Sequence, residues 1–316
     1  MKIAVADNCS RKFSDDIINH FEKKHEVQYQ SGASAELAQW ADLYYIDWAD
    51  NNLAYLYKLY TDDRDNQRPD DWDNNKKPMI VVRAIDWELW TLAMHRDQER
   101  TSWVDKWICI APHIEEKLRA EADFRTGQLK LIRPGVNLDK FTLKTTKTDG
   151  FQIGMVLGDF WPQAKNHMGG LDIFTTLYKR DNRWRLHLRG QHEGGDYWPK
   201  MYEHYLDSRG IRDAVTLYPH VDDMNEFYEK IDILLHPGMK ESFCYAVGEA
   251  MAKGLPVVCN EFYGSKDIWP VWILYQTHEE AVAKIQLAFQ QNNREWIEEM
   301  YPLDKMLGGI DKFLGT

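Results

Sequence analysis

Two glutamates in the last third of the chain have the spacing and the surroundings of a binding site. Glu241 and Glu249 lie in the run 236–258, HPGMKESFCYAVGEAMAKGLPVV, which follows the apolar residues IDILL. This pattern predicts a buried strand, a loop with Glu241, a helix with Glu249, a stop at Gly254 and a further strand. A loop that leads into the start of a helix presents backbone amides to an anion, and carboxylates accept hydrogen bonds from hydroxyl groups.

The arrangement resembles the E-x7-E motif of the retaining GT-B glycosyltransferases of family 4, which typically have PS..E.F....EAMA.G.PVV at this place. The segment 132–137 (IRPGVN) is similar to the IPNGVD segment that ends the first domain of that family. Lys165, which follows Gly158, matches the lysine of the GR…KG element, and Gly190 matches the glycine after the next strand. The segment 263–267 (YGSKD) resembles the GG..E loop, so the resemblance covers about residues 130–270.

The resemblance implies an α/β fold of the GT-B type, with two Rossmann-like domains that face each other across a cleft. It predicts an acceptor-binding domain at residues 1–146, a domain that binds the nucleotide-sugar donor at 147–295, and a C-terminal helix at 296–316 that packs back on the first domain. It implies an enzyme that transfers a sugar from a nucleoside-diphosphate sugar to an acceptor hydroxyl and retains the anomeric configuration. No cofactor is expected besides this co-substrate.

The resemblance also implies roles for single residues. Glu241 would hold a hydroxyl of the donor sugar and Lys165 would neutralise the leaving group, so these two are the expected catalytic residues. The expected donor and nucleotide residues are Glu249, which would accept hydrogen bonds from the ribose, and Ser242, Phe243, Cys244, Gly158, Asp159, Lys240, Gly190 and Val221. The expected acceptor-side residues are Asp7, Asn8, Arg83, Asp86 and Glu88.

Elementary electrostatics agrees with these roles. The negative charge of a diphosphate grows as the sugar departs, and the amides of Ser242, Phe243 and Cys244 would meet it at the positive end of the helix dipole. Lys165 would add a mobile cation, and preorganised charge of this kind is a large contribution to catalysis. No DxD motif ends a strand in the donor half. Because the lysine and the helix end would do what Mg²⁺ does elsewhere, no metal is expected.

Each of these residues also has a purely structural interpretation. A pair of glutamates in and beside a helix commonly decorates a solvated face, and a single lysine such as Lys165 is commonly a surface charge. His236 is expected to cap its strand and pack without a ligand role, while Gly135 and Gly254 serve turns whatever the function. The small residues around Glu249, and the buried strands that flank its helix, favour the functional interpretation.

Three positions depart from the family pattern. Asp159 stands where family members carry the arginine of GR, which removes a cation from the diphosphate site unless Lys240 replaces it. The glycine-rich loop after the first strand is missing, and residues 7–11 (DNCSR) occupy its place. The segments 47–48 and 83–88 resemble the EW and R.H..E segments of some members, but Ile85 replaces the histidine. These departures concern the acceptor side and the efficiency more than the fold.

Elements that suit such a fold are predicted along the whole chain. Apolar runs alternate with helical stretches, which is typical of parallel βαβ units. The expected strands span residues 2–6, 25–29, 41–48, 78–84, 107–111, 129–133, 151–157, 185–189, 215–218, 231–235 and 256–259. The expected helices include 15–24, 52–60 and 279–290, with one or two short helices at 296–314. The polar residues 61–77 predict a surface loop and residues 143–150 a linker.

Length and composition limit the classes of protein. A chain of 316 residues with 44% hydrophobic and 28% charged residues favours two globular domains. The apolar start is too short for a signal peptide, and no apolar run is long enough to span a bilayer. Four scattered cysteines without a CxxC pair disfavour disulfides and structural zinc and favour a cytoplasmic location. The net charge of −11 repels nucleic acid and anionic lipids, which disfavours both as partners.

Two other functions stay open on the sequence alone. The same fold serves sugar-nucleotide epimerases, and the aspartate at position 159 also fits a weakly active or inactive protein that binds nucleotide sugars. A further alternative is a non-enzymatic carbohydrate-binding protein, since 13 tryptophans and 16 tyrosines supply faces that stack on sugar rings. The donor sugar, its base and the acceptor, whether a glycan, a glycoconjugate or a small molecule, are open as well.

Overall fold

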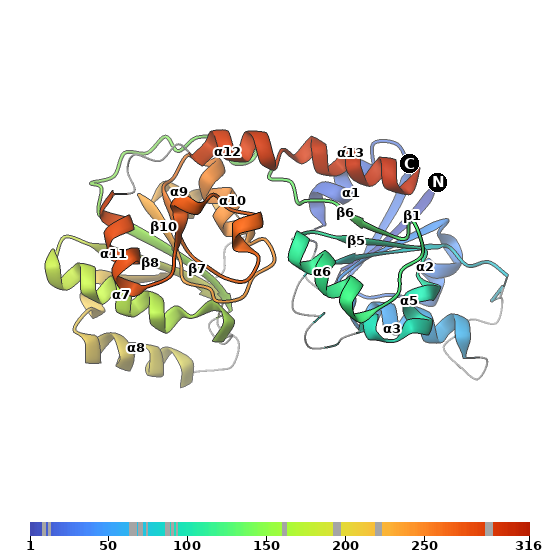
Figure 1. The fold of residues 1–316 in the computed structure, drawn as a ribbon, viewed down its shortest axis with the longest axis horizontal. Coiled ribbons are helices and arrows are strands. Elements are labelled where there is room, and N and C mark those ends of the chain that lie inside the picture. The colour runs from blue at the N-terminus through green and yellow to red at the C-terminus, as the bar shows by residue number, and fades with distance from the viewer. Residues whose placement is uncertain are drawn as a thin grey trace. The chain divides into compact units, whose positions relative to one another are not determined.

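The computed structural model divides the chain into two compact units, each of which forms its own sheet (Figure 1). Unit 1 consists of Met1–Gly135 and Asp304–Thr316, and unit 2 of Val136–Leu303. The structure describes residues 1–7, 11, 14–62, 68, 72–73, 75–85, 89, 92, 94–159, 163–191, 197–218, 223–287 and 293–316. None of the helices within these ranges is long and apolar enough to cross a membrane.

Unit 1 is built on a parallel sheet. Its strands are β1 (Lys2–Asp7), β2 (Glu26–Gln30), β3 (Leu43–Asp47), β4 (Met79–Ala84), β5 (Lys106–Cys109) and β6 (Leu129–Leu131). They lie in the order β2-β1-β3-β4-β5-β6, and every neighbouring pair is parallel. All of β3, and all of β1 except Lys2, is buried. Burial on both faces explains why these strands are continuous apolar runs rather than alternating ones.

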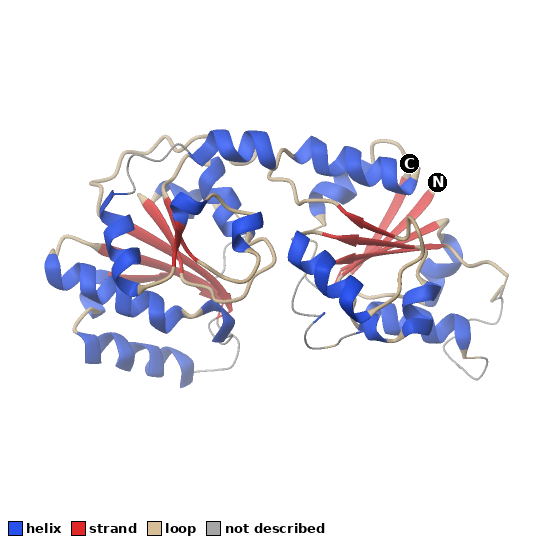
Figure 2. Ribbon diagram, in the orientation of Figure 1, coloured by secondary structure: helices blue, strands red, loops and turns tan. Residues whose placement is uncertain are grey.

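Helices pack against this sheet (Figure 2). They are α1 (Asp15–Phe21), α2 (Ala35–Trp40), α3 (Asn51–Thr61), the short 3-10 helix η1 (Met94–Arg96), α5 (Gln98–Trp103), α6 (Pro112–Glu121) and α13 (Leu303–Leu314). The side chains of Ser34, Asp50 and Asp97 each accept a hydrogen bond from an amide in the first turn of α2, α3 and α5. Such caps satisfy amides that the helix itself leaves without a partner.

The last helix, α13, packs in unit 1 although it follows unit 2 in the sequence. Its apolar stripe buries Met306, Leu307, Ile310 and Leu314. On the adjoining face, Asp311 Oδ1 lies 2.9 Å from His20 Nε2 of α1, and Lys106 Nζ lies 4.7 Å from the ring of Phe313. Both ends of the chain therefore lie in the same unit (Figure 1).

Unit 2 has a second parallel sheet with a different strand order. Its strands are β7 (Gln152–Asp159), β8 (Arg185–Gln191), β9 (Val215–Tyr218), β10 (Ile233–His236), β11 (Val257–Asn260) and β12 (Leu274–Tyr275). They lie in the order β12-β11-β10-β7-β8-β9, so the chain starts in the middle, builds one side and then the other. This is the order of the Rossmann fold, and its direction reverses between β7 and β10.

Helices and short 3-10 turns connect and follow the strands of unit 2. They are α7 (His167–Arg180), α8 (Tyr197–Arg209), α9 (Asn225–Glu229), α10 (Tyr245–Ala252), α11 (His278–Leu287) and α12 (Asn293–Met300), with the 3-10 turns η2 (Gln163–Lys165), η3 (Arg212–Ala214), η4 (Ser265–Asp267) and η5 (Val271–Ile273). Leu171, Phe174 and Leu177 of α7 share one core cluster with residues of β7, β8 and β10. Gly254, with a φ of 75°, follows the end of α10 as predicted.

The two predicted Rossmann-like α/β units and the predicted strands are confirmed. Each of the eleven predicted strands overlaps one of β1 to β11, and only the two-residue β12 has no counterpart in the prediction. The helix predicted at 52–60 is α3, and the predicted tail consists of α12 and α13. Of the polar stretch predicted as a loop, residues 63–67, 69–71 and 74 lie outside the described residues.

The boundary between the units differs from the predicted one. The chain enters unit 2 at Val136 rather than after residue 146. The reason is hydrogen bonding, because the Val136 amide donates to the carbonyl of Tyr301 at 2.9 Å and the Lys144 amide to that of Lys253 at 2.9 Å. The segment read as a linker is thus bound along unit 2. Likewise, α12 stays in unit 2, and the return to unit 1 occurs at Asp304 rather than at residue 296.

Candidate active site

The strand order of unit 2 places two loops at one point of its sheet. Where the order of a parallel sheet reverses, the loops after the two central strands run in opposite directions and leave a crevice that commonly binds ligands. Here the loops follow β7 and β10. They are joined by a hydrogen bond from the Met239 amide to the carbonyl of Ala164 at 2.7 Å. The side chain of Asn166 also donates to the carbonyl of Pro237 at 3.2 Å.

This junction brings Lys165 and Glu241 together. Lys165 Nζ lies 2.5 Å from Glu241 Oε1 although 76 positions separate them in the sequence. Lys165 is partly exposed, whereas Glu241 is buried. Burial alone would raise the pKa of Glu241, but the Lys165 ammonium and His236 lower it to about 2. The glutamate is therefore an ionised hydrogen-bond acceptor at neutral pH.

His236, the last residue of β10, contacts this carboxylate. It is 2% exposed, and its Nε2 lies 3.3 Å from Glu241 Oε1, which allows ionic attraction without hydrogen-bond geometry. Its Nδ1 lies 3.5 Å from Cys244 Sγ. Burial alone would lower the pKa of His236, yet Cys244 and Glu241 raise it above the usual range. The sequence predicted only packing for His236, and its contact with Glu241 is an addition to that interpretation.

The helix that follows this loop carries Glu249, as predicted. Cys244 is its N-cap, with a φ of 62°, and α10 starts at Tyr245. The Cys244 carbonyl accepts from the Val247 amide at 3.0 Å, which is a hydrogen bond of the first turn of the helix. Phe243 is 1% exposed, and its ring packs 4.8 Å from Trp269. Phe243 would thus contact a nucleotide sugar through its backbone, and the same holds for Ser242, which is also buried.

Glu249 lies one turn further along α10 and is held by a tyrosine. The hydroxyl of Tyr228, in α9, donates to Glu249 Oε2 at 2.7 Å. Tyr228 is fully buried, whereas Glu249 is partly exposed. Sequence reasoning did not single out Tyr228. A buried tyrosine needs a partner for its hydroxyl, but no local pattern tells which residue that partner is.

The remaining donor residues lie around the ends of β7 and β8. Gly158 pairs in register with Gly190, and Asp159 with Gln191, at the carboxyl ends of these strands. Arg189, next to Gly190, is 1% exposed and was not among the predicted site residues. Burial and Glu249 raise the pKa of the Tyr228 hydroxyl, whereas the positive charge of the Arg189 guanidinium lowers it. Arg189 is thus a buried cation on the strand beside the position where the family arginine is replaced.

Two further donor candidates have a simpler outcome. Lys240 is partly exposed in the loop before Glu241. Val221 lies outside the described residues.

On unit 1, the predicted acceptor residues lie where that sheet changes direction. Its order reverses between β1 and β3, whose last residues, Asp7 and Asp47, are paired in register. Arg83 of β4 donates two hydrogen bonds of 2.6 Å to Asp47, and Ser14 Oγ donates to Asp7 at 2.7 Å. Asp7, Asp47 and Arg83 are all buried. Asn8, Asp86 and Glu88 lie outside the described residues.

Among the described residues, one group has the donor atoms for a metal ion. Single ligand atoms of His236, Glu241 and Cys244 lie within 4.8 Å of one another. Lys165, however, already places an ammonium 2.5 Å from the carboxylate. A cation bound there would compete with Lys165 for Glu241 Oε1.

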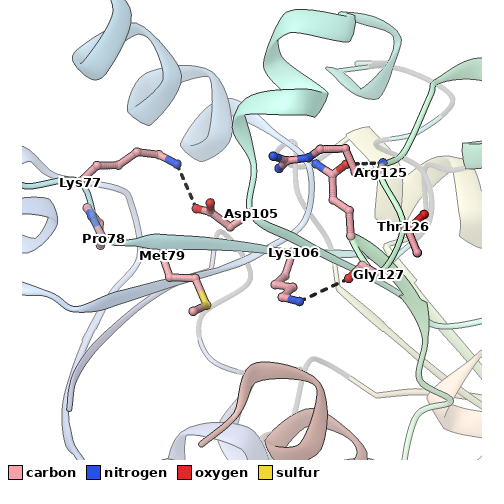
Figure 3. Close-up of a pocket in the computed structure, with 9 residues that line it drawn as sticks. Lys77, Pro78, Met79, Asp105, Lys106, Arg125, Thr126 and Gly127 are labelled. Carbon is pink, nitrogen blue, oxygen red and sulfur yellow. Dashed lines mark hydrogen bonds and ion pairs between the residues drawn. The ribbon is translucent and has the colours of Figure 1, made fainter.

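A separate cavity of about 550 Å³ lies in unit 1, at the amino ends of β4 and β5 (Figure 3). It is lined by Lys77, Pro78, Met79, Asp105, Lys106, Arg125, Thr126, Gly127 and Gln128. Each of its three cationic side chains donates to an acceptor of the same unit. Ligands of such sheets bind at the carboxyl ends of the strands. This cavity is at the opposite ends, and it is not the candidate site.

Comparison with known proteins identifies a family that is similar to most of unit 2. Residues 152–285 match the family described as glycosyl transferases group 1. A GDP-mannose-dependent alpha-mannosyltransferase of Mycolicibacterium smegmatis is 44% identical over 41 residues, which are 13% of this chain and 11% of that protein. The chain thus aligns with a small part of the length of this relative.

Solved structures extend the likeness to the whole chain. HepE of Anabaena, in complex with UDP and glucose, has a TM-score of 0.74 at 15% identity and covers 100% of both chains. Sucrose-phosphate synthase of Thermosynechococcus elongatus has a TM-score of 0.74 at 13% identity and covers 100% of this chain and 98% of its own. The two Rossmann-like units therefore have the GT-B fold. The resemblance to group 1 glycosyltransferases, identified from the E-x7-E motif, is confirmed for residues 152–285.

Proposed function

We propose that the chain is a glycosyltransferase that moves a sugar from a nucleoside-diphosphate sugar to an acceptor hydroxyl with retention of configuration. The observation that carries this proposal is the 2.5 Å contact between Lys165 and Glu241 at the reversal point of unit 2, directly before α10. A cation, a buried carboxylate and the start of a helix meet there. These groups suit a ligand with both hydroxyls and a diphosphate.

Each group would act on a different part of the donor. The amides at the start of α10 would bind the diphosphate, and Lys165 would neutralise the negative charge that grows on it as the glycosidic bond breaks. Glu241, which His236 and Lys165 keep ionised, would accept a hydrogen bond from a hydroxyl of the departing sugar. Glu249 would accept hydrogen bonds from the ribose. The leaving group would depart as the nucleoside diphosphate.

The donor classes to test first follow from the relatives. HepE is solved with UDP and glucose, and the mycobacterial relative is GDP-mannose-dependent. The acceptor would be a glycan, a glycoconjugate or a small molecule, because the net charge of −11 opposes binding to nucleic acid. The free thiols of Cys109, Cys244 and Cys259 suit a reducing cytoplasm, where nucleotide sugars would be the donors. We propose that no metal is needed, since Lys165 occupies the place of a cation.

The proposal is tested first by binding and then by transfer. Thermal unfolding with UDP, GDP, UDP-glucose and GDP-mannose should show a rise in melting temperature with at least one of them, in buffer with EDTA. Transfer to a panel of sugar acceptors, followed by NMR of the product, gives the anomeric configuration. Hydrolysis or isomerisation of the donor without transfer would show a different reaction at the same site.

Matched variants separate the site from general effects on the fold. Lys165→Ala should lower the transfer rate by about 10²- to 10³-fold, the range expected when one preorganised charge is removed. Lys179→Ala, an exposed lysine on α7 of the same unit, should leave the rate unchanged. Equal rates for the wild type and Lys165→Ala would contradict the proposed role of the contact with Glu241.

A further inference from the structure

Two consecutive residues of α9 bind Glu249 of α10 and Lys253, the C-cap of that helix, which lies one turn further on. Tyr228 donates to Glu249 Oε2 at 2.7 Å, and Glu229 Oε1 accepts from Lys253 Nζ at 2.6 Å. Residues four positions apart lie on the same side of a helix. The side of α10 that carries Glu249 is therefore fixed against α9 at two points, which we call the α9–α10 clamp.

The outer half of this clamp is itself anchored. Lys253 is 4% exposed. Burial alone would raise the pKa of Glu229, but Lys253 and the backbone of the 145–146 segment lower it to about 2. The carboxylate also accepts from the amides of Thr145 and Thr146, at 3.1 Å and 2.8 Å. The helix that carries Tyr228 is therefore anchored by bonds other than the one between Tyr228 and Glu249.

Tyr228 is built to donate and to stay in place. Its ring packs 6.1 Å from Phe141 and 5.9 Å from Phe227, both near perpendicular. Burial, together with the charge of Glu249, holds the pKa of its hydroxyl well above the ordinary value, so the group keeps its proton at any working pH. Its hydroxyl also lies 3.3 Å from the carbonyl of Ala246, in the turn that precedes Glu249.

We propose that Tyr228 is a positioning residue for Glu249 and thereby sets the preference of the site for ribose over 2′-deoxyribose. This inference rests on the proposed function, in which Glu249 binds the ribose of the donor. The terminal torsion of a glutamate is soft, so an unheld carboxylate rotates and presents its oxygens to two neighbouring hydroxyls only part of the time. A hydrogen bond to Oε2 from a fixed donor selects one orientation. In this orientation the carboxylate can accept hydrogen bonds from two ribose hydroxyls at once. A single hydroxyl, by contrast, can be bound in several orientations of the carboxylate.

The test compares ribose with deoxyribose nucleotides in a variant that keeps the packing. Tyr228→Phe removes the hydroxyl alone. The Kd of the preferred nucleoside diphosphate, measured by calorimetry, should rise about tenfold, as expected for the loss of a hydrogen bond to a charged group. The Kd of the 2′-deoxy form should change much less, so the ratio of the two Kd values should fall. If Tyr228 had a merely structural role, the substitution would raise the Kd of both nucleotides by the same factor.

Two controls make the result decisive. Tyr178→Phe, a half-buried tyrosine on α7 that packs on Phe174, should change neither Kd nor their ratio. In a double-mutant cycle, Tyr228→Phe should add little to Glu249→Ala, because the alanine variant has no carboxylate left to position. This cycle also reads the bond from its acceptor end if the phenylalanine variant loses stability.

The outcomes separate this inference from the proposed function. If the wild type binds a nucleoside diphosphate and Tyr228→Phe keeps the wild-type ratio of ribose to deoxyribose affinity, the positioning role is wrong while the donor site stands. Additive effects in the double-mutant cycle would overturn the positioning role in the same way. If the wild type binds no nucleoside diphosphate, the proposed function fails and this inference fails with it.

Discussion

A methyl group added at Gly238 tests how closely the loop after β10 is packed around the site. An ideal Cβ at this position would lie 2.6 Å from His236 Nε2 and 3.2 Å from Glu241 Oε1. A contact of 2.6 Å forces something to move, and the ring of His236 is 2% exposed and has little free space. We therefore expect Gly238→Ala to displace the imidazole, the carboxylate or the loop itself.

The size of the effect follows from the packing. Overpacking of a filled site costs about 1–3 kcal/mol, which lowers the melting temperature by about 5 °C for units of this size. A displacement on the order of 1 Å in a catalytic group lowers the rate by about a hundredfold. Gly238→Ala should thus lose both stability and transfer rate.

Gly308→Ala is the matched control for this substitution. Gly308 lies on the exposed side of α13, and its added Cβ would meet nothing within 4 Å. In a helix this change should stabilise the protein by about 0.5–1 kcal/mol, which is opposite in sign to the effect at Gly238. Calorimetric unfolding and initial transfer rates measure both variants. A wild-type melting temperature and rate for Gly238→Ala would refute the packing argument.

Three further predictions concern backbone strain, pH and a buried ion pair. Cys244→Gly should raise the melting temperature, because a φ of 62° costs a non-glycine residue about 1 kcal/mol; a lower one would mean that the contact with His236 outweighs the strain. Folding lowers the pKa of Glu241 from 4.5 to about 2, so the stability that this group contributes above pH 4.5 is lost as the pH falls toward 2. The free energy of unfolding should therefore fall more steeply with decreasing pH in the wild type than in Glu241→Gln. Equal slopes for the two proteins would contradict the shift in pKa. In unit 1, Arg83→Met should cost about 3–5 kcal/mol, because it leaves the buried carboxyl of Asp47 without its cation, and Asp47→Leu added to it should restore most of the stability; denaturant titration that shows additive losses would count against a direct pair.

The architecture was predictable because it depends on patterns along the chain. The continuous apolar runs of β3 and β10 reflect strands that are buried on both faces, and their alternation with helices reflects parallel crossovers. Gly254 was predictable as a helix stop because helices commonly end with a residue of positive φ, a conformation that glycine adopts at little cost. The boundary at Val136 was not, since the hydrogen bond from its amide to Tyr301 joins segments far apart in sequence.

The candidate site was predictable only as far as local motifs reach. Glu241, Glu249 and Lys165 lie in segments with recognisable spacing, and the structure brings Glu241 and Lys165 into contact. Tyr228 and Arg189 were missed because their significance lies in what they contact, namely a carboxylate on another helix and a buried hydroxyl. No spacing within one segment carries that information. Phe243 shows the reverse case, a motif residue whose side chain belongs to an aromatic cluster.

A crystal structure of the chain with UDP or GDP bound, in the absence of metal, shows where the nucleotide lies. The diphosphate should lie against the amides at the start of α10, in contact with Lys165, and the ribose should lie on Glu249. A nucleotide bound elsewhere, such as in the cavity beside Lys106 in unit 1, or one whose diphosphate lies out of reach of Lys165, would contradict the proposed donor site.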